Sequence, residues 1–108
     1  MSTGKRVINT RRTASISGNF EFIAKIKGVD RLAWGIGWDG DLLGDLTIEI
    51  SNDGVNWFPS SAVVFPPSGG PGKGYAELET AAAYARLLFV YVGGFGTLTS
   101  HLIGKAHG

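Results

Sequence analysis

The chain has 108 residues, the size of one domain, and 44% of them are hydrophobic while 18% are charged, which is typical of a folded protein. It has no cysteine, which excludes disulfide bonds, thiolate catalysis and cysteine-bound zinc or iron–sulfur centres. A net charge of +1 argues against a general polyanion binder, and no apolar stretch reaches the roughly 18 residues of a membrane span. Seventeen glycines, more than twice the usual share of about 7%, indicate many tight turns.

The first twelve residues are basic and contain little apolar material. They hold four of the ten basic residues, and no acidic residue precedes Glu21. Such a segment buries too little surface to offset the entropy of ordering, so we predict a flexible arm over residues 1–12 and one domain over 13–108. In an assembly the arm can add a strand to an exposed sheet edge, its bases facing an acidic neighbour. The residues of this assembly arm are Lys5, Arg6, Val7, Ile8, Arg11 and Arg12.

From residue 19 onward the apolar residues alternate with polar or small ones, as in strands with one buried face. Segments 19–27 and 45–51 follow this pattern. In 31–38, Leu32, Trp34, Ile36 and Trp38 share one face, and Ala33, Gly35 and Gly37 make up the other. Glycines on one face of a strand let another backbone or a bulky ring approach closely.

The second half of the chain continues this β pattern between glycine-rich turns. Asn52-Asp53-Gly54 predicts a hairpin turn, and residues 66–74 predict a mobile loop. We predict a strand from about Tyr84, with one helical turn at 81–83 as an alternative, and a closing strand over 97–106. The expected fold is an all-β antiparallel sandwich or jelly roll of seven or eight strands.

Two segments together resemble discoidin-like domains, the C-type modules of coagulation factors, over about a third of the chain. LTIEISNDGVNWFP is similar to their strand–turn–strand signature, and Ala85-Arg86-Leu87 is similar to the start of their closing strands. The resemblance implies a jelly roll. Discoidin domains are longer and usually carry a cysteine pair, so no ligand-binding residue is transferred. The residues that carry this fold signature are Ser51, Asp53, Gly54, Trp57 and Arg86.

A looser resemblance links the chain to small structural proteins of tailed bacteriophages. Those proteins are similar in being short, glycine-rich and free of cysteine, and in carrying an S-N-D-G-x-x-W hairpin, here residues 51–57. The first residues lack the apolar region of a secretory signal peptide, so a protein with an extracellular role is expected to leave the cell by another route, such as lysis.

The sequence gives little support to catalysis. His107 is next to the last residue, where chains fray, and His101 shares its parity with Thr97 and Thr99, the expected solvent face. No nucleophile-elbow or phosphate-loop spacing is present. We therefore expect a protein that is not an enzyme.

Calcium is the one metal that the sequence suggests. Asp39, Asp41 and Asp45 stand like positions 1, 3 and 7 of an EF-hand loop. Leu43 offers no side-chain oxygen at position 5, however, and Ile50 stands where a bidentate glutamate is required. A solvated acidic turn is the simpler interpretation, and no other cofactor is expected.

Aromatic residues raise the question of sugar or nucleic-acid binding. Most of the twelve rings alternate with aliphatic residues, as core positions do, but an exposed platform from Tyr75, Tyr84 or Tyr91 would suit a glycan. Nucleic acid is not an expected partner, because the basic arm has no aromatic residue to stack on bases.

The function that these observations favour is a non-enzymatic bacteriophage virion component, either a capsid decoration or a fibre or tail-associated protein. Apolar residues on both parities of the strand near residue 90 (Phe89 and Tyr91, Val90 and Val92) predict self-association, for which a trimer would be suitable. The expected partners are copies of itself and other virion proteins, without a membrane. The alternative is a discoidin-like carbohydrate- or surface-binding module.

Overall fold

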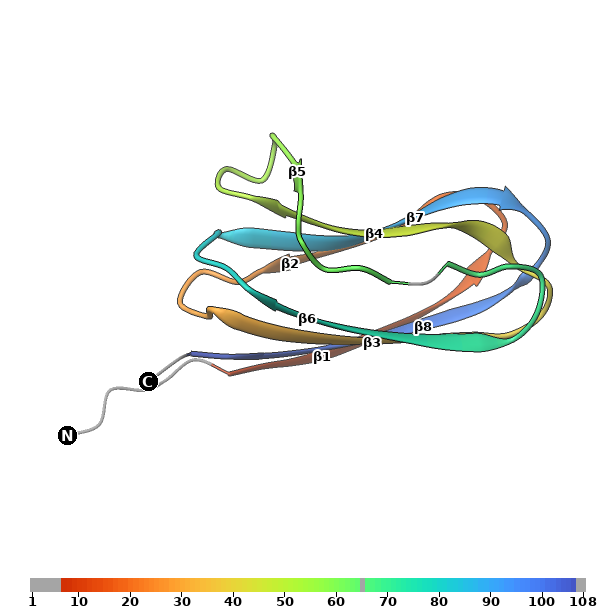
Figure 1. Ribbon diagram of the computed structural model, residues 1–108, viewed down its shortest axis with the longest axis horizontal. Helices are drawn as coiled ribbons and strands as arrows, with labels where there is room; N and C mark the ends of the chain where they lie inside the picture. The colour runs from red at the N-terminus through yellow and green to blue at the C-terminus, as the bar shows by residue number, and fades with distance from the viewer. Residues whose placement is uncertain (1–6, 65, 107–108) are drawn as a thin grey trace.

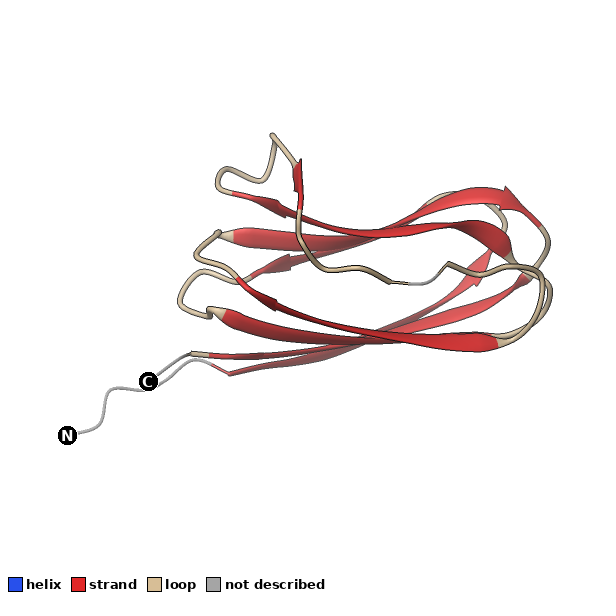
Figure 2. Cartoon of the chain, viewed as in Figure 1, coloured by secondary structure: helices blue, strands red, loops and turns tan. Residues whose placement is uncertain are grey.

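The structure is a computed structural model that describes residues 7–64 and 66–106, and this part of the chain is an all-β sandwich without helices (Figures 1 and 2). All strand pairs are antiparallel. The predicted fold class is therefore confirmed. The strands are β1 (Val7–Ile16), β2 (Phe20–Lys25), β3 (Arg31–Trp38), β4 (Leu43–Ser51), β5 (Phe58–Pro59), β6 (Gly72–Glu79), β7 (Tyr84–Gly93) and β8 (Gly96–Lys105).

The eight strands form two four-stranded sheets in the order of a jelly roll. One sheet has the order β1-β8-β3-β6 and the other has the order β2-β7-β4-β5. The first strand pairs with the last, the second with the seventh, the third with the sixth and the fourth with the fifth. This pairing is what results when one long antiparallel ribbon is wrapped around a core. Figure 1 shows the two sheets facing each other.

Alternating residues from both sheets fill the space between them. Leu32, Trp34, Ile36 and Trp38 of β3 are all buried, as their shared parity predicts. The Trp34 ring meets the edge of Phe22 from the opposite sheet, with centroids 5.4 Å apart. Its indole N–H donates to the hydroxyl of Ser100 at 2.6 Å, so the largest buried side chain has its polar atom satisfied.

The first strand begins earlier than the predicted domain boundary. Residues 7–12, which we predicted to lie in a flexible arm, belong to β1, and every residue of β1 pairs with β8. The sequence prediction was based only on the small apolar content of this segment. In the structure, main-chain pairing with β8 along the whole of β1 stabilises it. The arm residues Lys5 and Arg6 lie outside the described residues.

Two further segments differ from expectation. The predicted mobile loop over 66–74 is shorter than expected, because β6 starts at Gly72. The Trp38 indole packs so closely on Gly72 that a Cβ there would come within 2.8 Å of the ring. The alternative helical turn at 81–83 does not form, and the strand starts at Tyr84 as predicted. A search of the described residues for an apolar helix of membrane-spanning length finds none.

Candidate functional site

A groove runs along the outer face of the β1-β8-β3-β6 sheet, with β3 as its floor. After Arg31, the outward residues of β3 are small: Ala33, Gly35 and Gly37. A Cβ placed on Gly35 would meet only the His101 carbonyl oxygen, at 4.0 Å, and one on Gly37 would meet nothing within 4 Å. The floor is therefore low because side chains are missing from it, and it is open to solvent.

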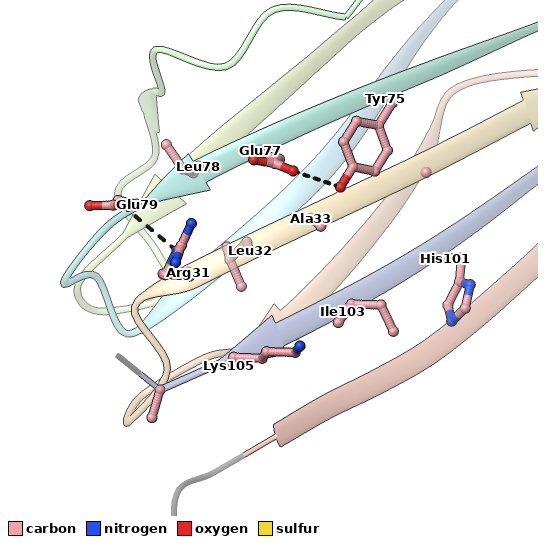
Figure 3. A pocket seen from close by; sticks show the side chains of 12 residues that line it. Arg31, Leu32, Ala33, Tyr75, Glu77, Leu78, Glu79, His101, Ile103 and Lys105 are labelled. Atoms are coloured by element: carbon pink, nitrogen blue, oxygen red, sulfur yellow. Dashed lines mark hydrogen bonds and ion pairs between the residues drawn. The ribbon is translucent and has the colours of Figure 1, made fainter. Parts of the chain in front are cut away.

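The neighbouring strands supply the walls of this groove. Gly35 pairs with Tyr75 of β6 on one side and with His101 of β8 on the other. One row along, Ala33 lies between Glu77 and Ile103. Since adjacent strands are about 4.8 Å apart, the two walls stand about 10 Å apart at the backbone. The part of the hollow between Arg31 and His101 has a volume of about 680 Å³. Figure 3 shows the residues of the two walls on either side of β3.

Tyr75 and Glu77 form the polar and aromatic wall. The Tyr75 hydroxyl donates to Oε2 of Glu77 at 2.8 Å, and this hydrogen bond raises the pKa of Tyr75 above its ordinary value. The phenol is therefore protonated at neutral pH. The side chain is 62% exposed, so the ring is available to a ligand.

The opposite wall carries His101, which is half-buried on the outer face, where sequence parity placed it. Its Nε2 lies 2.7 Å from Oδ1 of Asn9 on β1. When Nε2 donates to this oxygen, Nδ1 of the neutral ring remains an acceptor.

The groove carries more positive than negative charge. Four bases and two acids line its two parts, which leaves a formal charge of +2. One acid, Glu79, faces Arg31 at 3.7 Å, and the other, Glu77, accepts from Tyr75. The bases are Arg11, Arg31, Lys73 and Lys105.

A second surface lies on the outer face of the other sheet. Leu88, Val90 and Val92 follow one another on the outward side of β7, and Leu43 of β4 pairs with the adjacent Gly93. We call these four aliphatic residues the apolar patch. Val92 is 68% exposed. The sequence analysis considered both faces of this strand for self-association. Phe89 lies in the core, so the face of Val90 and Val92 is the one that points outward.

The acidic residues proposed for calcium hold turns in place. Oδ1 of Asp39 accepts from the backbone N–H of Thr97 at 2.6 Å, and Oδ1 of Asp41 accepts from that of Phe95 at 2.7 Å. Asp45 is on β4, paired with Val90. The structure does not gather the three carboxylates, and residues 7–64 and 66–106 contain no group of three or more potential metal ligands of the His, Asp and Glu types.

The hairpin signature residues come together at the end of β4. The buried Ser51 hydroxyl accepts from the backbone N–H of Gly54 at 2.8 Å. Oδ1 of Asp53 accepts from the N–H groups of Val55 and Asn56, both at 2.8 Å. These backbone hydrogen bonds hold the pKa of Asp53 well below its usual range. Gly54 has φ of 77°, a conformation that glycine adopts without strain.

Arg86 and Trp57, the remaining signature residues, pack against each other. The guanidinium lies over the Trp57 ring, 4.5 Å from its centroid. It also donates to Glu49 at 2.7 Å and to Glu21 at 2.6 Å. Burial lowers the pKa of Arg86, but the hydrogen bonds to the two carboxylates and their negative charges together raise it by more, so the net shift is upward. These contacts hold the hairpin against the sheet.

The remaining arm residues are divided between the two sides of β1. Arg12 points inward at the edge of the sandwich, with its guanidinium 5.1 Å from the centroid of the Phe22 ring. Arg11 faces outward and pairs with His101 beside the groove. Val7 is exposed and Ile8 packs against the core.

Sequence reasoning found the parts of the groove separately. The sequence predicted that one face of β3 carries only small side chains and that Tyr75 could be exposed. It did not predict the strand register that places Gly35 between Tyr75 and His101. That register joins three segments that are distant in sequence, and no local pattern specifies it.

Comparison with known protein families and with curated proteins finds no match to this chain. Among solved structures, the SPBc2 prophage-derived protein YomS is similar, with a TM-score of 0.66 at 11% sequence identity. The match covers 95% of this chain and 97% of that one. It shows a shared fold over almost the whole of both chains. The structural neighbour is thus a phage-derived protein, and the discoidin-like resemblance stays a prediction.

Proposed function

We propose that this chain is a non-enzymatic structural component of a phage virion that acts by protein–protein assembly. The observation that carries the proposal is the likeness to a prophage-derived protein over 95% of the chain. The side-chain contacts agree with a structural role, since His101 lies against Asn9, and Asp39 and Asp41 bind backbone N–H groups. Capsid decoration, a fibre or a tail position would each suit such a protein.

The apolar patch is the surface that we assign to assembly. Leu43, Val90 and Val92 are 40%, 39% and 68% exposed and lie near the end of the sheet where the β4–β7 register shifts between Leu43 and Gly44. Burying neighbouring aliphatic side chains stabilises a contact by about 25 cal/mol per Å² of apolar area, before the costs of association. A second copy of this chain is the proposed partner, and a closed trimer is the expected assembly.

Light scattering during size-exclusion chromatography tests this assembly. The full chain is expected to form a discrete oligomer at high micromolar concentration, and Val92→Lys is expected to weaken it about tenfold or more, because it places a charge in the contact. Val55→Lys is the matched control, since Val55 is 76% exposed on the β4–β5 turn, away from the patch. A monomeric full chain at that concentration, or equal effects of the two variants, would contradict self-assembly through this patch.

Virion association has a separate test. Particles purified from a phage or prophage that carries this gene are expected to contain the chain in stoichiometric amounts by quantitative mass spectrometry. Its presence only in the unassembled fraction of the lysate would contradict the virion role.

A further inference from the structure

We propose that the groove over β3 binds an acidic saccharide, with a sugar ring lying above Gly35 against Tyr75 and the anionic groups of the ligand near the bases along the groove. This inference does not depend on a virion role. It rests on the shape, the aromatic wall and the charge of the groove, taken in that order.

The floor excludes a ligand that binds through its main chain. β3 is an inner strand, paired with β6 on one side and β8 on the other, so its backbone N–H and C=O groups are already used. A peptide therefore cannot add to it as a further strand. A ligand over Gly35 and Gly37 must instead fill a shallow trough and bond to side chains on the walls.

A sugar ring has the chemistry that these walls accept. The face of a pyranose is a set of C–H groups that pack on an aromatic ring, and Tyr75 offers an exposed one. Its rim of hydroxyl groups needs both donors and acceptors. The groove supplies acceptors in the Glu77 carboxylate and in Nδ1 of His101, which stand on opposite sides of the floor, and donors in the ammonium groups of Lys73 and Lys105.

The charge of the groove selects an acidic sugar. Arg31 faces Glu79, whereas the three ion pairs found in the described residues do not include Arg11, Lys73 or Lys105. Lys105 lies at one end and Lys73 at the other, flanking Arg31 and Gly37 respectively. Carboxylate or phosphate groups spaced along a ligand would meet them.

The length of the groove indicates an oligosaccharide. Four successive outward rows of β3, from Arg31 to Gly37, span about 20 Å at about 3.3 Å per residue. This is longer than one sugar ring. Single-stranded nucleic acid fits less well, since it needs rings for successive bases and Tyr75 is the one Phe, Tyr or Trp among the lining residues of the described chain.

Isothermal titration calorimetry and amide chemical shifts of the full chain test the proposal. The probes are trigalacturonic acid for the carboxylate form, maltotriose phosphorylated on a 6-hydroxyl group for the phosphate form, maltotriose as the neutral saccharide and a thymidine hexanucleotide. At least one acidic saccharide is expected to bind with a Kd of about 1 mM or tighter. It is also expected to bind about tenfold better than maltotriose and to weaken with salt. The shifts should centre on Gly35, Tyr75 and His101.

Two variants locate the binding without relying on loss of fold. Tyr75→Ala removes the ring and is expected to weaken binding about tenfold. Gly35→Val fills the floor, and since a Cβ there has space and valine favours strands, the chain should fold while losing about tenfold or more in affinity. Gly93→Val is the matched control, because Gly93 is a strand residue of the other sheet whose Cβ would meet nothing within 4 Å. Thermal unfolding confirms that each variant is folded.

Three results would overturn the inference. The first is that no acidic saccharide binds at millimolar concentration. The second is that Gly35→Val binds as well as Gly93→Val. The third is that the hexanucleotide binds the groove more tightly than every saccharide, which would make the site a nucleic-acid surface.

Discussion

Arg86 connects more of the structure than any other signature residue. Its side chain is 18% exposed, it bonds to carboxylates from β2 and β4, and it supports the ring of Trp57 after the hairpin turn. A guanidinium is suited to this position because it binds carboxylates in its plane while its face packs on an aromatic ring. The hairpin and both neighbouring strands therefore depend on one side chain.

Replacing Arg86 with alanine is expected to lower the free energy of unfolding by about 2–4 kcal/mol, since it leaves Glu49, which is 19% exposed, without its cation. Arg86→Lys should recover only part of this, because an ammonium cannot make the stacked and forked contacts together. Arg31→Ala is the control, as Arg31 and Glu79 are 56% and 70% exposed, and it should cost about 0–1 kcal/mol. Urea unfolding monitored by tryptophan fluorescence measures all three. Equal losses for Arg86→Ala and Arg31→Ala would refute this account.

Asp53 makes the free energy of unfolding depend on pH in the acidic range. Its pKa is lower in the folded chain than in the unfolded chain, so the carboxylate stabilises the fold above its unfolded pKa of about 3.9 and loses that contribution as the pH falls. Asp53→Asn removes the charge. We expect the melting temperature of the variant to lie below that of the parent chain at pH 7, and this difference to narrow as the pH falls from about 4 to about 2. A difference that is constant over this range would mean that the charge is unimportant.

Strand β1 shows how an element can form with little apolar content of its own. Val7 is exposed, and the inward-facing Arg12 interrupts the apolar parity that Ala14 and Ile16 continue. The ladder with β8 compensates for this, and Arg12 itself covers the edge of Phe22. The strand thus depends on a partner at the other end of the chain.

Deleting residues 1–12 is expected to destabilise the domain, because it removes six rows of the β1–β8 ladder, from Val7 to Arg12. We expect a loss of about 2–4 kcal/mol from the broken hydrogen bonds, reduced by the regained chain entropy. Deleting residues 1–6, which precede the described part of the chain, should leave the melting temperature within about 2 °C of the full chain. If both deletions unfold at the same temperature, the β1 ladder contributes little.

The sequence predicted strands well where apolar and polar side chains alternate. It predicted them less well where main-chain pairing with a partner strand determines the structure. The alternation in β3 identified which of its residues are buried, and the turn at Asn52–Gly54 followed from its residue types. The starts of β1 and β6 escaped prediction, because Arg12 breaks the apolar parity and residues 72–74 are mostly glycine. Both segments are specified by their partner strands, which sequence periodicity does not show.

At the scale of the whole molecule, the two surfaces lie on opposite sides of the sandwich. The groove is on the outer face of the β1-β8-β3-β6 sheet and the apolar patch is on the outer face of the β2-β7-β4-β5 sheet. An assembly formed through the patch would therefore leave the groove open to solvent. Neither surface could be located from sequence alone, because each is defined by which strands become neighbours.

The pairing of the first strand with the last also determines how the domain would carry load. Val7 lies opposite Lys105, so the start of β1 and the end of β8 lie at the same corner of the sandwich, as Figure 1 shows. A pull on the two ends acts across the β1–β8 ladder, whose hydrogen bonds run perpendicular to the strands. The bonds then open in succession from that corner, as in a zipper, instead of resisting together as they would in shear. A tether attached through both ends would peel this domain open at low force, whereas one attached through the opposite faces of the sandwich would leave the ladder unloaded.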